Sequence, residues 1–186
     1  MGSEMCIRDS NWAYELAMRY PIDMSKYTPL VHYCNELRAG RRVPTTARVT
    51  SAQLGSFPYV DGKYLSGGSI GIWATEGVMA EPGDVLIAGV GYRSNARIAT
   101  ERMIAGTDIY VLRLKEPHLA TALVAYLNGQ EGYDQRKLHI SGSVIPRLSL
   151  GGLKRLGVNE SRLSEHNIDI HSSVDLASRL DAVLWN

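Results

Sequence analysis

Cysteine is scarce in this sequence, with only Cys6 and Cys34 among 186 residues. Two cysteines exclude a disulfide framework and a cysteine zinc site, and this usage fits a reducing compartment. Long apolar runs are also missing, because none approaches the roughly 18 residues that span a bilayer, and no signal peptide is evident. These features predict a soluble protein of the cytoplasm.

A strong charge of either sign is missing as well, since the formal net charge is +1. A value this small gives no overall signal of a nucleic-acid partner. The charge is unevenly distributed, however, because residues 159–186 hold five acidic and two basic side chains. Residues 1–158 therefore carry 18 basic and 14 acidic side chains, a net charge of +4. This mildly basic body permits DNA binding without requiring it.

No residues have the spacing of a catalytic or metal site. The five histidines are scattered, and only the pair His166 and His171 would support a metal site, if a strand brought them together. A nucleophile elbow is missing, and Gly89-Val90-Gly91 lacks the third glycine and the following helix of a dinucleotide fingerprint. We therefore expect no catalytic residues, no metal and no cofactor.

The N-terminal part divides into two segments. Residues 1–10 are expected to be non-native, because Met5 to Ser10 reads like the translation of a sequencing-library adapter. The chain is then expected to be a piece of a longer protein, the alternative being an ordinary disordered N-terminus. Residues 11–40 are predicted to be helical, with one helix from Asn11 and a second from Thr28-Pro29 to Gly40.

From Arg41 onward, short apolar runs between glycine-rich turns predict strands. The predicted strands cover residues 48–50, 57–60, 85–90, 96–99 and 109–114. Helices are expected over residues 117–127, 133–138 and 149–156, and from Ser172 or Ser173 onward. This pattern predicts an α/β (α+β) domain over residues 41–158, followed by a linker and a C-terminal helix over residues 159–186.

Two segments about fifty residues apart carry most of the functional information. They are EPGDVLIAGVGYRSNARIAT (residues 81–100) and HISGSVIPRLSLGGLKRLGV (residues 139–158). With LRAGRRVPTTA, FPYVDGKYLSGGSI and HLATALVAYLNG in the same order, they resemble the target recognition domain of the DNA specificity subunits of type I restriction-modification systems. The resemblance covers residues 37–158. This sequence departs from the family's pattern before the last helix, where the usual proline-rich segment with a glutamine is weak. It implies a mixed, curved β-sheet with flanking helices.

The resemblance implies sequence-specific recognition of double-stranded DNA, which directs a methyltransferase subunit, and with it a restriction subunit, to a target site. Catalysis would lie on those partners or on a missing fused domain. A single copy of the domain implies either a half-subunit that forms a homodimer on a palindromic site or a piece of a longer chain. Two alternatives stay open: a protein-interaction or scaffold domain without DNA binding, and the recognition part of a fused adenine DNA methyltransferase.

DNA recognition needs groups that hold phosphates and groups that read base edges. Three segments offer such residues: Tyr92, Arg93, Asn95 and Arg97 in the loop 91–97; Lys137, His139, Ser141, Ser143 and Arg147, with Arg136, in the segment 136–147; and Lys63 and Tyr64 in the loop 62–69. Arg93 or Arg97 is expected to bind guanine, and Asn95 adenine. Arg41 and Arg42 either touch the DNA backbone or are simply solvated. DNA binding requires the three segments to converge on one positive face, whereas scattered segments would favour protein interaction.

Overall fold

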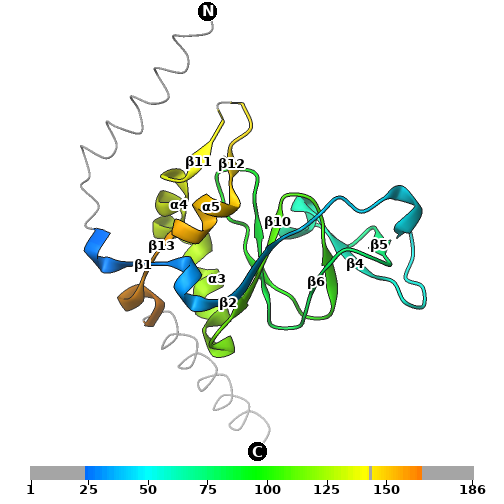
Figure 1. The fold of residues 1–186 in the computed structure, drawn as a ribbon, viewed down its shortest axis with the longest axis horizontal. Coiled ribbons are helices and arrows are strands. Elements are labelled where there is room, and N and C mark those ends of the chain that lie inside the picture. Colours follow the sequence, from blue (N-terminus) through cyan, green and yellow to red (C-terminus); the bar gives the residue numbers. More distant parts are fainter. Residues whose placement is uncertain (1–23, 143, 165–186) are drawn as a thin grey trace, which may run out of the picture.

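The computed structural model describes residues 24–142 and 144–164. Its two larger β-sheets pack together, and helices cover one of them (Figure 1). The first sheet has the strand order β2-β10-β7-β8, with every neighbouring pair antiparallel. Its strands are β2 (Cys34–Ala39), β10 (Ile109–Leu114), β7 (Val85–Ala88) and β8 (Arg97–Ile98). Helices cover one face of this sheet and the second sheet packs on the other, so the first sheet is central.

Burial of both faces explains the apolar runs in the central strands. Val85, Ile87 and Leu112 pack in the core beneath the helices, whereas Leu86 and Val111 pack in a core shared with the second sheet. A strand covered on both faces reads as a continuous apolar run rather than as an alternating one.

The second sheet has the order β3-β5-β4-β9-β6, and β4 and β9 are its parallel pair. Its strands are β3 (Arg48–Val49), β5 (Trp73–Ala74), β4 (Phe57–Val60), β9 (Met103–Ala105) and β6 (Val78–Ala80). Val60 and Ala105 face the central sheet, and Tyr59 and Ile104 face a small third core around Val43. The predicted α+β fold with a mixed sheet is therefore confirmed.

The helices follow β10 in the chain and cover the central sheet. They are η4 (Pro117–Leu119), α3 (Ala120–Asn128), α4 (Gln130–Lys137) and α5 (Leu150–Arg155). Leu123 and Leu127 lie on the buried face of α3, as the apolar spacing predicted, and Tyr126 is buried beside them. Ser149 caps α5, because its Oγ accepts a hydrogen bond of 3.0 Å from the Gly152 amide. A hairpin of β11 (Ile140–Ser141) and β12 (Arg147–Leu148) lies between α4 and α5.

The helix that we predicted from residue 28 to residue 40 is wrong. After η1 (Met24–Lys26), this part of the chain forms β1 (Tyr27–Pro29), the 3-10 turn η2 (Leu30–Tyr33) and β2. β1 pairs with β13 (Gly157–Asn159), and β2 pairs along β10. These long-range pairings outweigh the local helical spacing of apolar residues, a common tertiary override of propensity. The predicted helices at residues 11–20 and beyond residue 171 lie outside the described residues.

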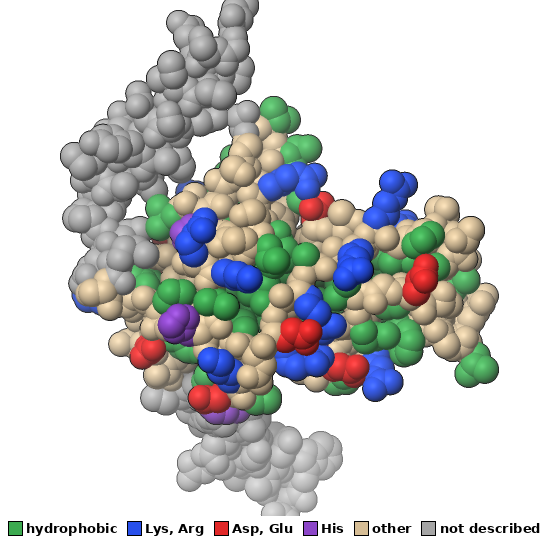
Figure 2. Space-filling model, viewed as in Figure 1, with side chains coloured by type: hydrophobic (Ala, Val, Ile, Leu, Met, Phe, Trp, Pro, Cys, Tyr) green, Lys and Arg blue, Asp and Glu red, His purple; other side chains and the backbone are tan. Residues whose placement is uncertain are grey.

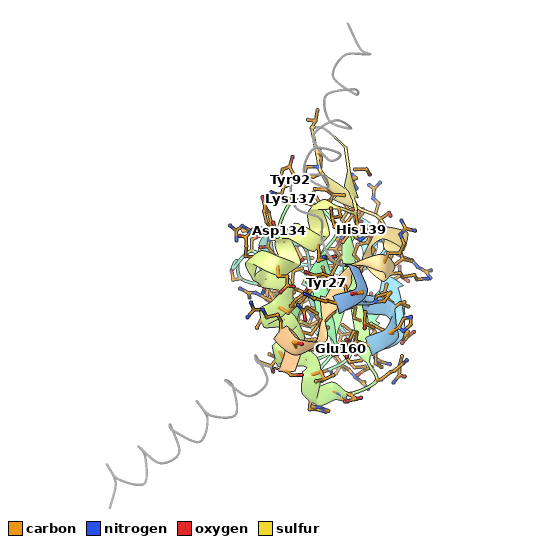
Figure 3. All side chains as sticks on the ribbon, turned by 90° about the vertical axis from the view of Figure 1, so that its left-hand side faces the viewer. Tyr27, Tyr92, Asp134, Lys137, His139 and Glu160 are labelled. Carbon is orange, nitrogen blue, oxygen red and sulfur yellow. The ribbon has the colours of Figure 1, made fainter. Side chains whose placement is uncertain are left out.

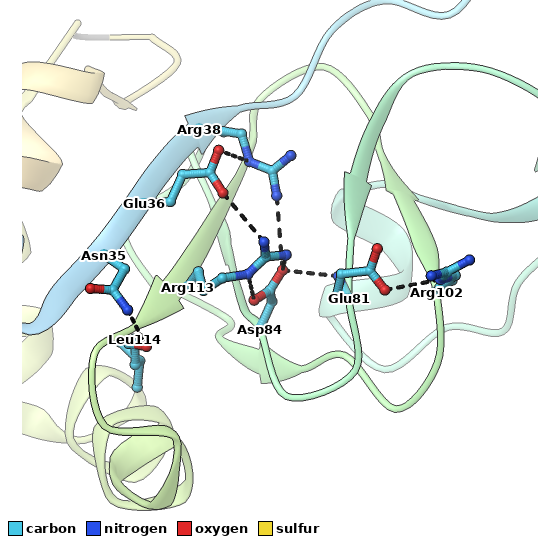
Figure 4. A network of polar contacts seen from close by, with 8 residues as sticks. All are labelled: Asn35, Glu36, Arg38, Glu81, Asp84, Arg102, Arg113 and Leu114. Atoms are coloured by element: carbon cyan, nitrogen blue, oxygen red, sulfur yellow. Dashed lines mark hydrogen bonds and ion pairs between the residues drawn. The ribbon is translucent and has the colours of Figure 1, made fainter.

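A buried carboxylate links the three strands at one end of the central sheet (Figure 4). Asp84 is 4% exposed and accepts hydrogen bonds of 3.0 and 2.9 Å from Nε and Nη2 of Arg113, and one of 2.9 Å from the Glu81 amide. Arg113 also lies 3.5 Å from Glu36, and Arg38 lies 3.9 Å from Asp84. The network joins β2, β7 and β10 at the end opposite to the candidate site described below.

Two short segments complete the fold. Asp61 caps the helix α2 (Gly62–Leu65) by accepting a hydrogen bond of 2.9 Å from the Tyr64 amide, where the sequence predicted only a turn. The 3-10 turn η3 (Thr45–Ala47) leads into β3. Within residues 24–142 and 144–164, no helix has both the length and the apolar character needed to cross a membrane.

Candidate nucleic-acid interface

The loop 91–97 leaves the central sheet at the end where β2 and β7 finish and β8 and β10 begin. The register places Ala39 opposite Tyr110, Ile109 opposite Ala88, and Leu86 opposite Arg97. Segments that follow β2 and β7, or precede β8 and β10, therefore emerge at this same end of the sheet, which we call the loop end. The hairpin β11–β12 joins them there, because the Leu148 amide donates a hydrogen bond of 2.8 Å to the Gly89 carbonyl.

The loop 91–97 is held at both of its ends by groups from other elements. Gly91 has a φ of +94°, its amide donates to the Pro146 carbonyl, and its carbonyl accepts a hydrogen bond of 3.0 Å from Arg136 Nε. At the other end, the Asn128 side chain bonds both the amide and the carbonyl of Ala96, at 2.7 and 2.9 Å. A loop fixed in this way loses less conformational entropy when it binds a ligand.

The loops 62–69 and 91–97 lie against one another. Asn95 has a left-handed φ of +43°, and its Nδ2 donates a hydrogen bond of 3.2 Å to Ser66 Oγ. The Arg97 guanidinium lies 5.1 Å from the centroid of the Tyr64 ring, within the range of a cation–π contact. Residues of both loops line a cavity of about 290 Å³. Lys63 is exposed in the same loop as Tyr64. The two adjacent loops thus hold six of the predicted residues: Lys63, Tyr64, Tyr92, Arg93, Asn95 and Arg97.

The helix α4 brings one aromatic ring, Tyr133, and one further cation, Lys137, to the loop 91–97. Arg93 and Lys137 both lie over the Tyr133 ring, at 5.8 and 4.2 Å from its centroid. Tyr92 is 49% exposed, and Figure 3 shows it beside Lys137 at the same end of the molecule. The segment 91–97 is thus in contact with both of the other predicted segments.

The hairpin places its predicted residues at the loop end, but with less net charge than we expected. Arg147 pairs with Asp108 at 2.7 Å, and both side chains are more than one-third exposed. An exposed pair of this kind contributes little to stability, although Asp108 offsets the charge of Arg147. Ser141 is exposed in β11, and Ser143 lies outside the described residues.

Arg136 is not the surface cation that we expected. Its side chain is fully buried, and burial lowers its pKa from 12.5 to about 10. Its Nη1 and Nη2 have no hydrogen-bond partner among the described residues. Arg136 therefore supports the loop 91–97 from within, through Gly91, and offers no direct contact to a ligand.

His139 also differs from the expected cation. It is partly buried, and burial together with the nearby positive charge of Arg155 lowers its pKa below 6.5, although a backbone hydrogen bond at Arg155 opposes this shift. The imidazole is therefore neutral at pH 7. Its ring adds no positive charge to the interface under those conditions.

The lowered pKa of His139 predicts a loss of stability in mild acid. Below pH 6.5 the unfolded chain binds a proton at this residue before the folded protein does, so this contribution to stability is complete above pH 6.5 and declines as the pH falls. We expect His139→Gln to show a weaker decline than the parent between pH 7 and pH 5 in urea unfolding. Parallel declines would show that other groups cause the acid sensitivity.

Sequence reasoning missed the groups that hold the loop in place. Asn128 was identified only as the end of a helix, and Asp108 was not considered. The sole signal was the Asn-Gly step after an apolar helix, which predicts a helix end and says nothing about Ala96. Among residues 24–142 and 144–164, no group of three or more His, Cys, Asp or Glu side chains is placed to hold a metal ion. His166 and His171 lie outside those ranges.

Several solved structures match this chain, among them the following three, each at a probability of 1.00. One is a chain from a structural study of complex assembly and conformational transition in a type I R-M system, at 17% identity and a TM-score of 0.59, with 97% of this chain and 50% of that one covered. Another is the S subunit of a type I restriction-modification system from M. genitalium, at 14% identity and a TM-score of 0.56, with coverages of 82% and 40%.

The HsdS subunit from Thermoanaerobacter tengcongensis matches at 17% identity and a TM-score of 0.51, with coverages of 95% and 49%. This chain thus spans half, or less than half, of the length of the structures that it matches. No protein-family model matches the sequence, and no curated protein does either. The solved structures show that the chain has the fold of part of the S subunits of type I restriction-modification systems, as the sequence resemblance implied.

Proposed function

We propose that this chain recognises a specific sequence in double-stranded DNA and thereby directs a restriction-modification complex to its target site. The observation that carries the proposal is that the other two predicted segments, 62–69 and 136–147, both contact the loop 91–97. This loop contacts Ser66 and Tyr64 on one side and α4 and the hairpin on the other. The fold shared with S subunits supports the same function.

The chemistry of this surface suits a nucleic acid better than a small substrate. Arg93, Arg97 and Lys137 supply positive charge beside aromatic rings, and Asn95 supplies an amide that can pair with a base edge. The cavity between the loops is small, and polar or cationic residues make up most of its lining, beside Leu65 and Ala96. Ser141 and Gly142 are exposed, and their small size leaves room for a phosphate to approach the backbone.

In this proposal the chain contributes recognition only, and its partners carry out catalysis. A methyltransferase subunit would modify the bound site, and a restriction subunit would cleave unmodified DNA. One recognition domain reads one half of a target, so either a homodimer or a longer chain with a second domain would read the whole site.

The proposal is tested by selection of bound duplexes from a random library, with the parent chain and with Arg93→Ala and Asn95→Ala. The parent is expected to enrich one short motif. Each variant should lose preference at one position, at a cost of about 1–3 kcal/mol for a lost bidentate contact. Sequencing of the bound pool measures the preference at every position.

Lys115→Ala is the matched control, because it removes an exposed cation that follows β10 at the opposite end of the central sheet. It should leave the selected motif unchanged. Enrichment of no motif by the parent would refute sequence-specific recognition. A motif that both loop variants retain would remove Arg93 and Asn95 from the readout.

A further inference from the structure

A second cationic surface lies beyond the predicted site, along the segment that follows β2. Arg41 and Arg42 are exposed, and within the described residues neither makes a hydrogen bond, an ion pair or a ring contact. They line a groove of about 530 Å³ together with Arg38 and Glu76. Arg42 also lines a neighbouring groove of about 440 Å³, together with Arg48 and two threonines.

The composition of these grooves fits a polyanion. Arg38 is paired with Glu36, and Arg48 lies over the Tyr59 ring at 5.0 Å with its buried Nε lacking a hydrogen-bond partner among the described residues. Arg41 and Arg42 therefore have the free guanidinium groups. Glu76 is the single acidic residue that lines either groove. Figure 2 shows Lys and Arg side chains spread over this face of the molecule, with most of the acidic ones in its lower half.

The register of the central sheet places this surface at the loop end. β2 finishes at Ala39 opposite Tyr110, and the Gly40 amide donates a hydrogen bond of 2.7 Å to the Ile109 carbonyl. Arg41 and Arg42 follow directly. They emerge from one edge strand, β2, whereas the loop 91–97 leads into the opposite edge strand, β8. Asp108 and Arg147 lie between them.

The separation of the two edges matches the width of a DNA groove. β2 and β8 are three strand spacings apart, or about 14 Å at a spacing of about 4.8 Å. The major groove of B-DNA is about 12 Å wide. A duplex that presents its groove to the loop 91–97 would therefore bring the phosphates of its far rim near residues that follow β2.

We infer that Arg41 and Arg42 bind phosphates on the rim of the DNA groove opposite to the loop 91–97. The inference rests on the proposed function and adds to it a surface for the DNA backbone that carries no sequence information. The sheet acts as a spacer between this phosphate contact and the base-reading loop. Glu76 weakens the contact through repulsion of the DNA.

The test uses the full chain and a labelled generic duplex, with binding followed by fluorescence anisotropy from 50 to 200 mM salt. Each phosphate contact adds about 0.9 to the slope of log K against log salt concentration. Loss of both contacts in the double variant Arg41→Ala/Arg42→Ala should reduce the slope by about 1.8, so that the fourfold rise in salt weakens its binding about twelvefold less than that of the parent. The motif selected from a random library should not change.

Two single variants accompany the double variant. Arg102→Ala removes an exposed arginine that pairs with Glu81 far from the loop end, and it should retain the parent slope. Glu76→Gln should tighten binding about two- to fivefold, because it removes the opposing charge. Duplex binding with an unchanged slope in the double variant would overturn the inference and leave the proposed function intact. Failure of the parent to bind any duplex would refute both.

Discussion

Arg136→Met is expected to raise the free energy of unfolding by about 1–2 kcal/mol. Burial lowers the pKa of this arginine from 12.5 to about 10, which corresponds to about 3 kcal/mol of unfavourable free energy for the charged form. Methionine fills a similar volume without a charge, and replacement of buried charges by apolar residues is often stabilising. The variant loses the hydrogen bond to Gly91, which offsets about 1–2 kcal/mol of the gain.

Urea unfolding of the parent, Arg136→Met and Lys154→Met measures this effect. Lys154 is an exposed cation on α5, so its replacement should change the free energy of unfolding by less than about 0.5 kcal/mol. A loss of 2 kcal/mol or more in Arg136→Met would mean that the bond to Gly91 outweighs the cost of the buried charge. That result would mean that Arg136 stabilises the fold, rather than holding the loop 91–97 at a cost in stability.

The stabilised variant is also expected to recognise DNA less sharply. Without the Arg136 guanidinium, the Gly91 carbonyl loses its donor, and this end of the loop 91–97 keeps only the hydrogen bond from the Gly91 amide to the Pro146 carbonyl. A looser loop can bind several bases at one position, which broadens the selected motif. A gain in stability together with a loss of selectivity is the usual relation when a strained group serves function.

Asp84→Ala is expected to lower the free energy of unfolding by about 2–3 kcal/mol. The carboxylate is buried and bonds both the Arg113 guanidinium and the Glu81 amide, so its removal leaves a cation and an amide without their acceptor. Removal of one partner from a buried pair costs about 3–5 kcal/mol, and partial exposure of Arg113 to water reduces that cost. Chemical denaturation with unchanged m-values measures the difference.

Arg102→Ala provides the control for Asp84→Ala within the same network. Arg102 pairs with Glu81 at 2.9 Å, but both side chains are exposed, so the loss should stay below about 1 kcal/mol. Equal losses of unfolding free energy in the two variants would contradict the view that burial makes the Asp84 contacts more stabilising than the exposed pair. A loss below 1 kcal/mol in Asp84→Ala would show that β2, β7 and β10 stay joined by their backbone pairing alone.

The local apolar pattern predicted the central strands and the helices that cover them. Val85–Ala88, Ile109–Leu114 and Ala120–Asn128 lie within or close to their predicted bounds, because burial of an apolar run or stripe stabilises each of them. The prediction for the segment of β2 was wrong, because Cys34 to Ala39 become a strand only through pairing with β10, about 75 residues later in the chain. Local spacing of apolar residues contains no information about such a partner.

The candidate site divides in the same way. The loop residues Arg93, Asn95 and Arg97 were identified from their chemistry, and their role in DNA recognition stays a prediction. The burial of Arg136 and the bonds from Asn128 to Ala96 depend on contacts across 45 and 32 residues. No periodicity or motif encodes those distances, so only the folded chain reveals which polar residues support the loop and which reach the surface.

The pairing of β1 with β13 has a consequence for how such a module is built into proteins. Tyr27 lies opposite Asn159, and Glu131 accepts hydrogen bonds from both side chains. The two ends of the segment 27–159 therefore lie side by side in the fold. A longer chain can thus accommodate residues 27–159 at a single surface turn without rearrangement of its own fold. Under the proposed function, exchange of these residues between two such proteins would exchange their DNA preferences.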